Sequence, residues 1–176
     1  MAKIAYTKLN AKVNQDVKTI PVEGTETPIE VIQYLPVNEK LDLITRVIQL
    51  SYDENNFSNP IKEEVYFILN VIEFYTNITF TEKQKENVTK LYDSLYSSGW
   101  AEKIINEIPG IEICDLRQGL KDTVAAFYSY RNSVLGILET MKTDYSNLDL
   151  DVEKLQEDLR DGKNIELLKE IMTKLG

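Results

Sequence analysis

Residues 59–75 read NPIKEEVYFILNVIEFY, and this stretch indicates a helical protein. Asn59 can cap a helix with its side chain, and Pro60 suits the first helical position because its missing N–H needs no partner there. Beyond them, apolar side chains return every three or four residues, which places them on one face of a helix. They are Val65, Ile68, Leu69, Ile72 and Tyr75. The stretch therefore predicts an amphipathic helix that packs against a core.

Further helices are expected on both sides of this stretch, because the same spacing recurs there. Thr81 and Gln84 match a capping box, in which each side chain bonds the backbone N–H of the other residue. Gly119 and Gly136 fall inside the longest predicted helix, and each costs about 1 kcal/mol relative to alanine, so we expect close helix packing at those points. The expected helices run from Pro36 or Asn38 to Tyr52, and over residues 60–75, 82–97, 100–107, 113–142, 152–160 and 165–175.

The first 37 residues have a different period. Residues 3–9, 17–22 and 28–35 alternate β-branched or aromatic side chains with polar ones, as strands do. Residues 23–28 gather turn-forming residues, so a hairpin should join the second and third segments. The fold class predicted is mainly α: a multi-helix bundle with one long helix, preceded by a small N-terminal β-hairpin or three-stranded element. We expect a β-rich segment over residues 1–37 and an acidic helical body over residues 38–176.

The composition offers no catalytic centre. The chain of 176 residues has no histidine and one cysteine, Cys114, which removes the commonest general base and any Cys/His metal cluster. The apolar surroundings of Cys114 favour a buried thiol in a reducing compartment. Acidic residues over 144–153 resemble a calcium loop, but Val152 stands where such a loop needs glycine, so we favour a polar loop. We expect no enzyme, no metal and no cofactor.

The charge of the chain limits its partners. The formal net charge is −9, and it lies entirely in residues 38–176, because residues 1–37 hold four lysines and four acids. An acidic body argues against direct nucleic-acid binding and against docking on anionic lipid. No stretch approaches the ~18 apolar residues that could span a bilayer. We therefore expect a cytoplasmic protein with no membrane and no nucleic-acid partner.

Two surfaces are candidates for contact with another protein. Tyr128, Tyr130 and Arg131 follow Phe127 on the longest predicted helix, and consecutive helical residues cannot share one core face. Tyrosine and arginine are enriched in interface hot spots, although tyrosines wedged between helices would give the same pattern.

The second surface is the N-terminal sheet. Two or three strands leave unpaired edges that can add to the sheet of a neighbour. Packing of the sheet on the chain's own helices is the competing interpretation. The contact candidates there are Val17, Ile20, Ile29 and Val31.

Several strings of the chain resemble one group of proteins. They cover residues 6–9, 17–20, 29–36, 75–85 and 91–95, and they look like small proteins encoded by bacteriophages of Gram-positive bacteria. The layout of a short β opening and an acidic helical body is also similar to that of tail-assembly chaperones, which hold the tape-measure protein while the tail tube polymerises. The resemblance implies other phage proteins as partners, with a homo-oligomer as a further option. It also implies the host cytoplasm as location, with incorporation in the virion as the alternative.

We therefore expect a non-enzymatic phage morphogenesis protein. The leading hypothesis is a tail-assembly-chaperone-like binder of another phage protein, and the alternative is a structural head, connector or tail component of the virion. A third hypothesis is an acidic inhibitor that mimics nucleic acid against a host protein. That inhibitor ranks lower, because lysines such as Lys83, Lys90 and Lys154 are interspersed among the acids.

Overall fold

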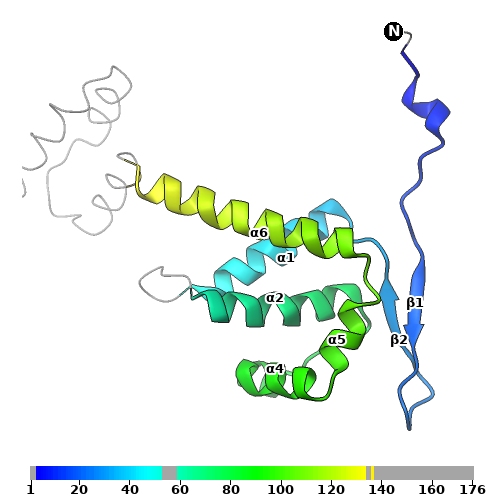
Figure 1. Ribbon diagram of the computed structural model, residues 1–176, viewed down its shortest axis with the longest axis vertical. Helices are drawn as coiled ribbons and strands as arrows, with labels where there is room; N and C mark the ends of the chain where they lie inside the picture. Colours follow the sequence, from blue (N-terminus) through cyan, green and yellow to red (C-terminus); the bar gives the residue numbers. More distant parts are fainter. Residues whose placement is uncertain (1–2, 53–58, 134–135, 137–176) are drawn as a thin grey trace, which may run out of the picture. The chain divides into compact units, whose positions relative to one another are not determined.

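The computed structural model describes residues 3–52, 59–133 and 136 of the chain. It is mainly helical, with a small antiparallel hairpin near the N-terminus, which confirms the expected fold class (Figure 1). The chain divides into two compact units, Met1–Lys121 and Asp122–Gly176. The elements are the 3-10 helix η1 (Tyr6–Leu9), strands β1 (Val17–Ile20) and β2 (Ile29–Ile32), and helices α1 (Val37–Ser51), α2 (Pro60–Tyr75), α3 (Glu82–Lys85), α4 (Val88–Ser97), α5 (Trp100–Ile105) and α6 (Gly110–Arg131).

Strands β1 and β2 form the hairpin that the sequence predicts. They pair antiparallel, with Val17 opposite Ile32 and Ile20 opposite Ile29. The turn between them holds Gly24 at φ 80°, a backbone conformation that glycine adopts without strain. Asn77 fastens β2 to the end of α2, since its side chain accepts from the Glu30 N–H (3.1 Å) and donates to the Pro28 carbonyl (3.1 Å).

The strand predicted over residues 3–9 is wrong. This segment holds the short 3-10 helix η1, in which the Lys8 N–H donates to the Ala5 carbonyl at 2.9 Å. Asn10 follows in the left-handed region at φ 49° and ends the helix. A strand needs a neighbouring strand for its hydrogen bonds, and among the described residues the sheet has two strands only. The segment therefore forms some of its backbone hydrogen bonds within itself.

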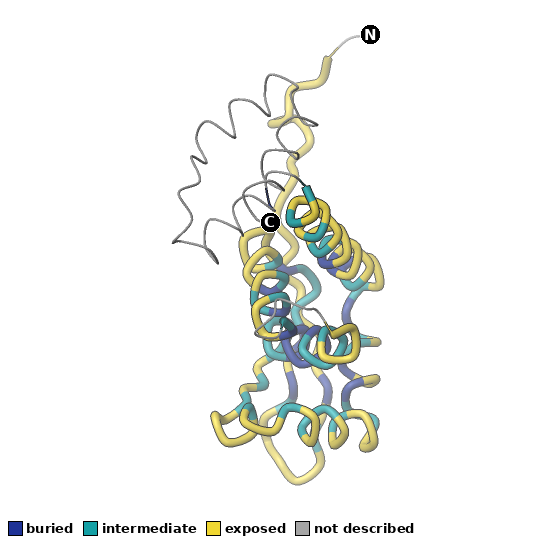
Figure 2. Tube along the Cα trace, turned by 90° about the vertical axis from the view of Figure 1, so that its left-hand side faces the viewer, coloured by how far each residue is buried: buried dark blue, intermediate teal, exposed yellow. Residues whose placement is uncertain are grey.

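Helix α2 supplies more of the large, fully buried side chains than any other element. The side chains of Phe67, Ile68, Val71, Ile72 and Tyr75 are all under 2% exposed. Asn59 caps the helix as expected, with its side chain accepting from the N–H groups of the second and third residues after it. The other fully buried large side chains come from β2, the loop after it, α1, α5 and α6: they are Val31, Leu35, Leu43, Val47, Ile104 and Leu116. Figure 2 shows that most buried residues gather inside the first unit.

Two predicted helix boundaries are corrected. The capping box at Thr81 is present, but the helix it starts ends at Lys85, and Asn87 caps a separate helix, α4. Asn87 has φ −128° and ψ 68°, and its side chain accepts from the Lys90 N–H at 3.1 Å, which competes with a continuous helix. Helix α6 ends at Arg131, because Ser133 then bonds the carbonyl of Tyr130 through its hydroxyl and its N–H. The helices predicted over 152–160 and 165–175 lie outside the described residues.

Gly136 lies beyond the end of α6, but Gly119 on α6 faces the side chain of Ile44 on α1. A Cβ at this position would lie 3.0 Å from Cδ1 of Ile44. A second contact joins α6 to α2: the Arg117 guanidinium bonds both carboxylate oxygens of Glu64, at 2.7 and 2.8 Å, and lies 4.5 Å from the ring centroid of Phe67. The first half of α6 thus belongs to the same core as α1 and α2.

A buried carboxylate connects four segments of this core. Glu112, near the start of α6, is 5% exposed. It accepts from Nζ of Lys40 on α1 (2.7 Å), from the hydroxyl of Tyr75 at the end of α2 (2.8 Å), and from the N–H of Leu35 between β2 and α1 (3.1 Å). Each partner is a donor, so the charge is compensated from three directions.

These contacts shift the pKa of two side chains. Burial by itself raises the pKa of Glu112, but the bonds from Lys40, the Leu35 N–H and Tyr75 outweigh it and hold that pKa below its ordinary value. Burial raises the pKa of Tyr75, and the hydrogen bond to Glu112 raises it further. At neutral pH Glu112 is therefore ionised and Tyr75 is protonated, and these are the protonation states that their hydrogen bond requires.

We expect Glu112→Gln to lower the free energy of unfolding at pH 7 by about 3 kcal/mol, because Lys40 then loses its buried counter-charge. A carboxylate with a depressed pKa stabilises the fold above its unfolded pKa of about 4.3, and this contribution disappears as the pH falls through the folded pKa. The difference in the free energy of unfolding between wild type and variant should therefore become smaller as the pH falls below about 4.3. Urea unfolding at several pH values measures both effects, and a difference that does not change with pH would contradict the role of the charge.

Candidate protein-binding site

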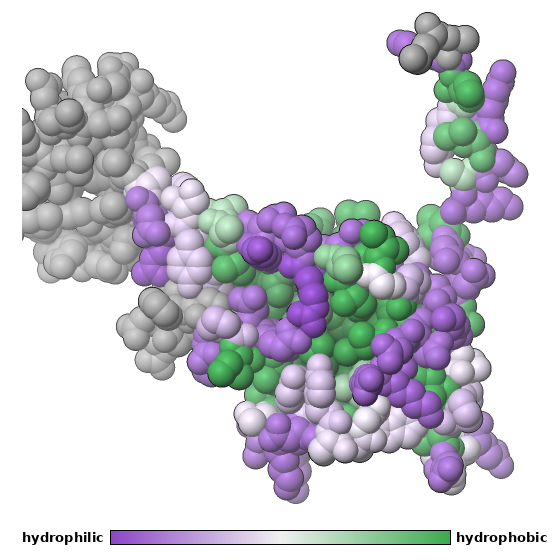
Figure 3. Space-filling model, viewed as in Figure 1, coloured by the Kyte–Doolittle hydropathy of each residue, from purple (hydrophilic) through white to green (hydrophobic). Residues whose placement is uncertain are grey.

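The segment before β1, residues 3–16, is an exposed apolar arm. Every residue in it is exposed, and the large apolar side chains Ile4, Tyr6, Leu9 and Val13 are 73, 71, 62 and 64% exposed. Figure 3 shows hydrophobic and hydrophilic side chains side by side along it. Single exposed apolar residues are ordinary on protein surfaces, but several on one short segment mark an interaction site.

The arm makes few contacts with the described remainder of the first unit. Among the described residues, hydrogen bonds of residues 3–15 stay within the arm: Lys8 N–H to the Ala5 carbonyl, and Asp16 N–H to Asn14 Oδ1 at 2.9 Å. Its end is fixed to β2, where the Gln33 N–H donates to the Asp16 carbonyl at 3.1 Å. The arm has three lysines and one aspartate, a formal charge of +2 on an acidic protein.

The arm continues into a strand with one open edge. Because Gln33 and Asp16 form a hydrogen-bonded pair opposite each other, the backbone groups of Lys18 and Ile20 face β2 in this antiparallel ladder. Those of Val17 and Thr19 therefore face the other edge of β1, where no described residue forms a strand. An extended segment of another chain could pair with this edge.

The contact candidates predicted in the sheet lie on different sides of it. Val17 is 49% exposed, beside the arm. Ile20, Ile29 and Val31 are 3, 9 and 0% exposed, so their side chains pack inside the protein's own core. The competing interpretation, a sheet packed on its own helices, describes these three residues, and Val17 is the exposed one of the four candidates.

The aromatic candidates on α6 belong to the second unit. Tyr130 is 46% exposed, while Tyr128 and Arg131 are half-buried. The rings of Phe127 and Tyr128 meet edge to face with centroids 6.0 Å apart. The prediction that these side chains bind a partner remains a prediction.

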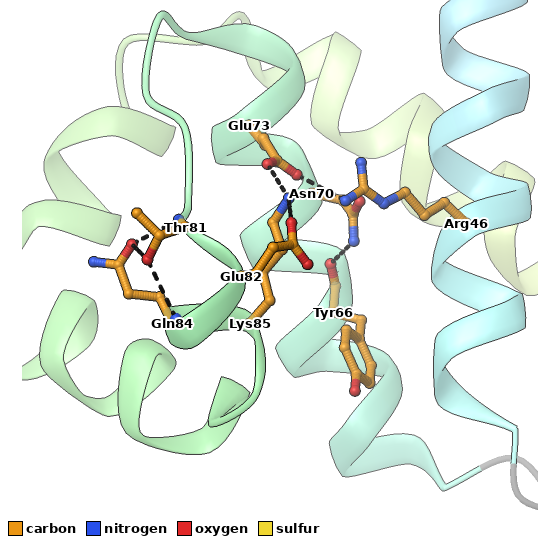
Figure 4. Close-up of polar contacts among 8 residues, drawn as sticks. All are labelled: Arg46, Tyr66, Asn70, Glu73, Thr81, Glu82, Gln84 and Lys85. Atoms are coloured by element: carbon orange, nitrogen blue, oxygen red, sulfur yellow. Dashed lines mark hydrogen bonds and ion pairs between the residues drawn. The ribbon is translucent and has the colours of Figure 1, made fainter.

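A cavity of about 510 Å³ opens between α1, α2, α3 and α4 in the first unit. This size lies within the range of about 300–1,000 Å³ that is usual for ligand pockets. Its apolar wall includes Leu69 from α2, Phe80 from the loop after α2, and Val88 and Leu91 from α4. Arg46, Asn70, Glu82 and Lys85 add polar groups, several of which Figure 4 shows. We call it the α2–α4 cavity.

Asn70 lies beside the α2–α4 cavity with one polar atom unpaired. The residue is 3% exposed, and its amide NH₂ donates to the Tyr66 carbonyl at 2.7 Å. Because that carbonyl can only accept, the amide cannot turn around, and Oδ1 lies on the other side. This oxygen accepts no hydrogen bond from any described residue, and less than 1 Å² of it is accessible, so it does not face the open part of the cavity. A buried acceptor without a donor costs about 1–3 kcal/mol, which the core around α2 has to offset.

The charges around the cavity are largely paired. Glu73 accepts from Nη2 of Arg46 and from Nζ of Lys85, each at 3.0 Å (Figure 4). Glu82 is different: its side chain is 92% exposed, and its contact with Lys85 is a loose 3.9 Å. The rim therefore offers a solvated carboxylate to a basic neighbour.

Sequence reasoning did not find the arm or the cavity. Alternation in residues 3–9 suggested a strand, and the sequence carries no local signal that shows whether a partner strand is present. Cys114, expected to be buried, is exposed on α6. Within residues 3–52 and 59–133, no three potential metal-binding side chains cluster, and no helix is long and apolar enough to cross a membrane.

Comparisons with protein-family models, curated proteins and solved structures found no match for this chain. The candidate surfaces on the described residues are therefore the exposed arm, the open edge of β1 and the α2–α4 cavity.

We expect serine substitutions at Ile4, Leu9 and Val13 to leave the fold unchanged. Each should alter the free energy of unfolding by less than about 0.5 kcal/mol, because these side chains are exposed. Ile20→Ser is the control from the buried end of β1 and should cost about 2–4 kcal/mol. Chemical denaturation measures both, and a large loss from the arm substitutions would show that the arm packs on its own chain.

Proposed function

We propose that this chain is a non-enzymatic assembly protein that binds another protein chain through its N-terminal arm. The observation that supports this most directly is the exposure of four large apolar side chains on one segment beside an open strand edge. Burying these side chains against a partner contributes about 25 cal/mol of binding free energy per Å² of apolar area. The core keeps its own contacts, because these side chains are not part of it. An extended arm can also add backbone hydrogen bonds along β1.

Bacteriophage morphogenesis is the setting that the sequence resemblance suggests. A tail-assembly-chaperone-like protein and a structural component of the virion both have to bind other assembly proteins. The exposed arm favours the structural component, because a segment that extends from its own core can tether one subunit to the next. An acidic chaperone that captures a basic partner does not require such an arm.

The test compares the wild-type chain with a variant carrying Ile4→Ser, Leu9→Ser and Val13→Ser. Each is co-expressed with the products of the neighbouring genes of its source genome, and its own mass is measured by light scattering. We expect the wild type to co-purify with a gene product or with further copies of itself, and the variant to lose that association at least about thirtyfold.

A matched control replaces Lys3, Lys8 and Lys12 by glutamine, which keeps the apolar side chains and removes the charge. This control should weaken binding less than the serine variant and should reduce its dependence on salt. If the wild type binds no chain at all, or if the serine variant binds as well as the wild type, the proposed function is wrong.

A further inference from the structure

We propose that β1 pairs antiparallel with β1 of a second copy of this chain, with the two Val17 residues opposite each other. This inference rests on the proposed function, because it names the partner for the open edge of β1 and the register of the contact. It starts from the hydrogen-bonding pattern of the hairpin and from the charges on either side of Val17.

The two edges of the hairpin differ. The edge of β2 that faces away from β1 is covered, since Val31 forms a bridge with Thr76 and the side chain of Asn77 accepts from a backbone N–H of β2 at 3.1 Å. Figure 1 shows β1 on the other side of β2 from the helices. Among the described residues, none bonds the outward backbone groups of Val17 or Thr19. The open edge of the hairpin is therefore formed by β1.

The backbone of this open edge limits how a second strand can pair with it. The groups that face the edge come from alternate residues, Gln15, Val17 and Thr19. In an antiparallel ladder, such residues lie opposite each other, and each pair exchanges two hydrogen bonds. Pro21 is the next residue of this series, and it ends the ladder because it has no N–H to donate.

Charge selects one register for two identical strands. A two-fold axis at Lys18 places the two Lys18 side chains opposite each other, and an axis at Asp16 does the same with the two Asp16 side chains. Like charges in such positions are destabilising. An axis at Thr19 would place Pro21 opposite Val17 and lose hydrogen bonds. An axis at Val17 places Asp16 of each copy opposite Lys18 of the other, so two pairs of opposite charge form.

Both charges are accessible for this contact. Asp16 is exposed, and no described residue forms an ion pair with its carboxylate. Lys18 bonds Glu107 of its own chain at 3.1 Å, and 52% of the Lys18 side chain is still exposed, so a second carboxylate can approach its Nζ. Exposed ion pairs contribute little affinity, and complementary charge mainly fixes register.

Val17 and Ile32 add apolar contact at the centre of the proposed dimer. They lie opposite each other in the hairpin, where Val17 is 49% exposed and Ile32 is half-buried. In the proposed register the two Val17 side chains become neighbours across the axis. A row of four apolar side chains, two from each copy, then crosses the joined sheet, and cross-strand pairs of β-branched residues stabilise a sheet.

An edge that pairs with its own copy is fully used when two chains meet. Such a contact is isologous, so it produces a dimer and no larger assembly. The inference therefore predicts a monomer–dimer equilibrium, with a four-stranded antiparallel sheet across the dimer axis.

Charge reversal tests the register. Full-length chains carrying Asp16→Lys or Lys18→Asp are compared with the wild type by analytical ultracentrifugation. Each variant places like charges opposite each other twice in its own dimer, so we expect its dimerisation to weaken about tenfold. An equimolar mixture of the two variants restores both opposite pairs in a mixed dimer, whose affinity should lie within about threefold of the wild type.

The matched control is Glu26→Lys in the exposed turn of the hairpin. It changes the net charge as Asp16→Lys does, but outside the proposed contact, and should leave dimerisation unchanged. Circular dichroism checks the fold of every variant. A wild type that stays monomeric up to its solubility limit, equal losses from Asp16→Lys and Glu26→Lys, or a mixture that associates no better than either variant alone would overturn the inference.

Cross-linking measures the register directly. Cys114 is exposed and is first replaced by serine. Opposite residues of a hydrogen-bonded pair have Cα atoms about 5.5 Å apart, so a short bis-methanethiosulfonate reagent should join Val17→Cys chains in pairs. Thr19→Cys is the control from the same edge, because its two copies would lie about 14 Å apart along the ladder. Equal yields of linked dimer at the two positions would refute the inference.

The two proposals fail in different ways. If the serine variant of the arm loses a co-expressed partner while the wild type remains a monomer, the arm binds a different protein and only the second-copy inference fails. If neither the arm substitutions nor the charge reversals change any association, both proposals fail.

Discussion

The first unit of this protein depends on one buried carboxylate. Glu112 holds the chain between β2 and α1 through the Leu35 N–H, helix α1 through Lys40, and the end of α2 through Tyr75. These partners lie on different segments of the chain, and the same carboxylate bonds all three. Directional hydrogen bonds of this kind fix the relative positions of the segments more specifically than apolar packing does. A burial of this kind is costly for an isolated charge, and the three donors are what make it tolerable. The bond from Leu35 also holds the chain just after the hairpin beside the start of α6.

Hydrogen bonding distinguishes the folded body of the first unit from the arm. After Asp16, hydrogen bonds at Gln33, Leu35 and Asn77 join one element to another. Before Asp16, the hydrogen bonds of the arm stay within the arm, and its apolar side chains are exposed. The body therefore fixes the end of the arm at Asp16, while the apolar side chains of the arm stay outside the core.

Much of the fold could be predicted from local sequence signals. The cap at Asn59 and the period of α2 are local, and so are the capping box at Thr81 and the hairpin turn at Gly24. The strand expected over residues 3–9 was wrong because strand formation depends on a distant partner, which alternation does not reveal. Asn87 broke a predicted helix through a side-chain contact with its own backbone. For the site, alternation identified the sheet but not which face was buried, and Asn70 looks like one polar position in an apolar helix until the cavity beside it is known.

The long reach of the Glu112 contacts has a consequence for synthesis on the ribosome. Leu35 and Glu112 are 77 residues apart, and Tyr75 and Glu112 are 37 apart. The nascent chain therefore contains Leu35 and Tyr75 well before translation reaches the carboxylate that accepts a hydrogen bond from each of them. These contacts form only after the start of α6 has been made, so they cannot guide the hairpin, α1 or α2 while those elements emerge.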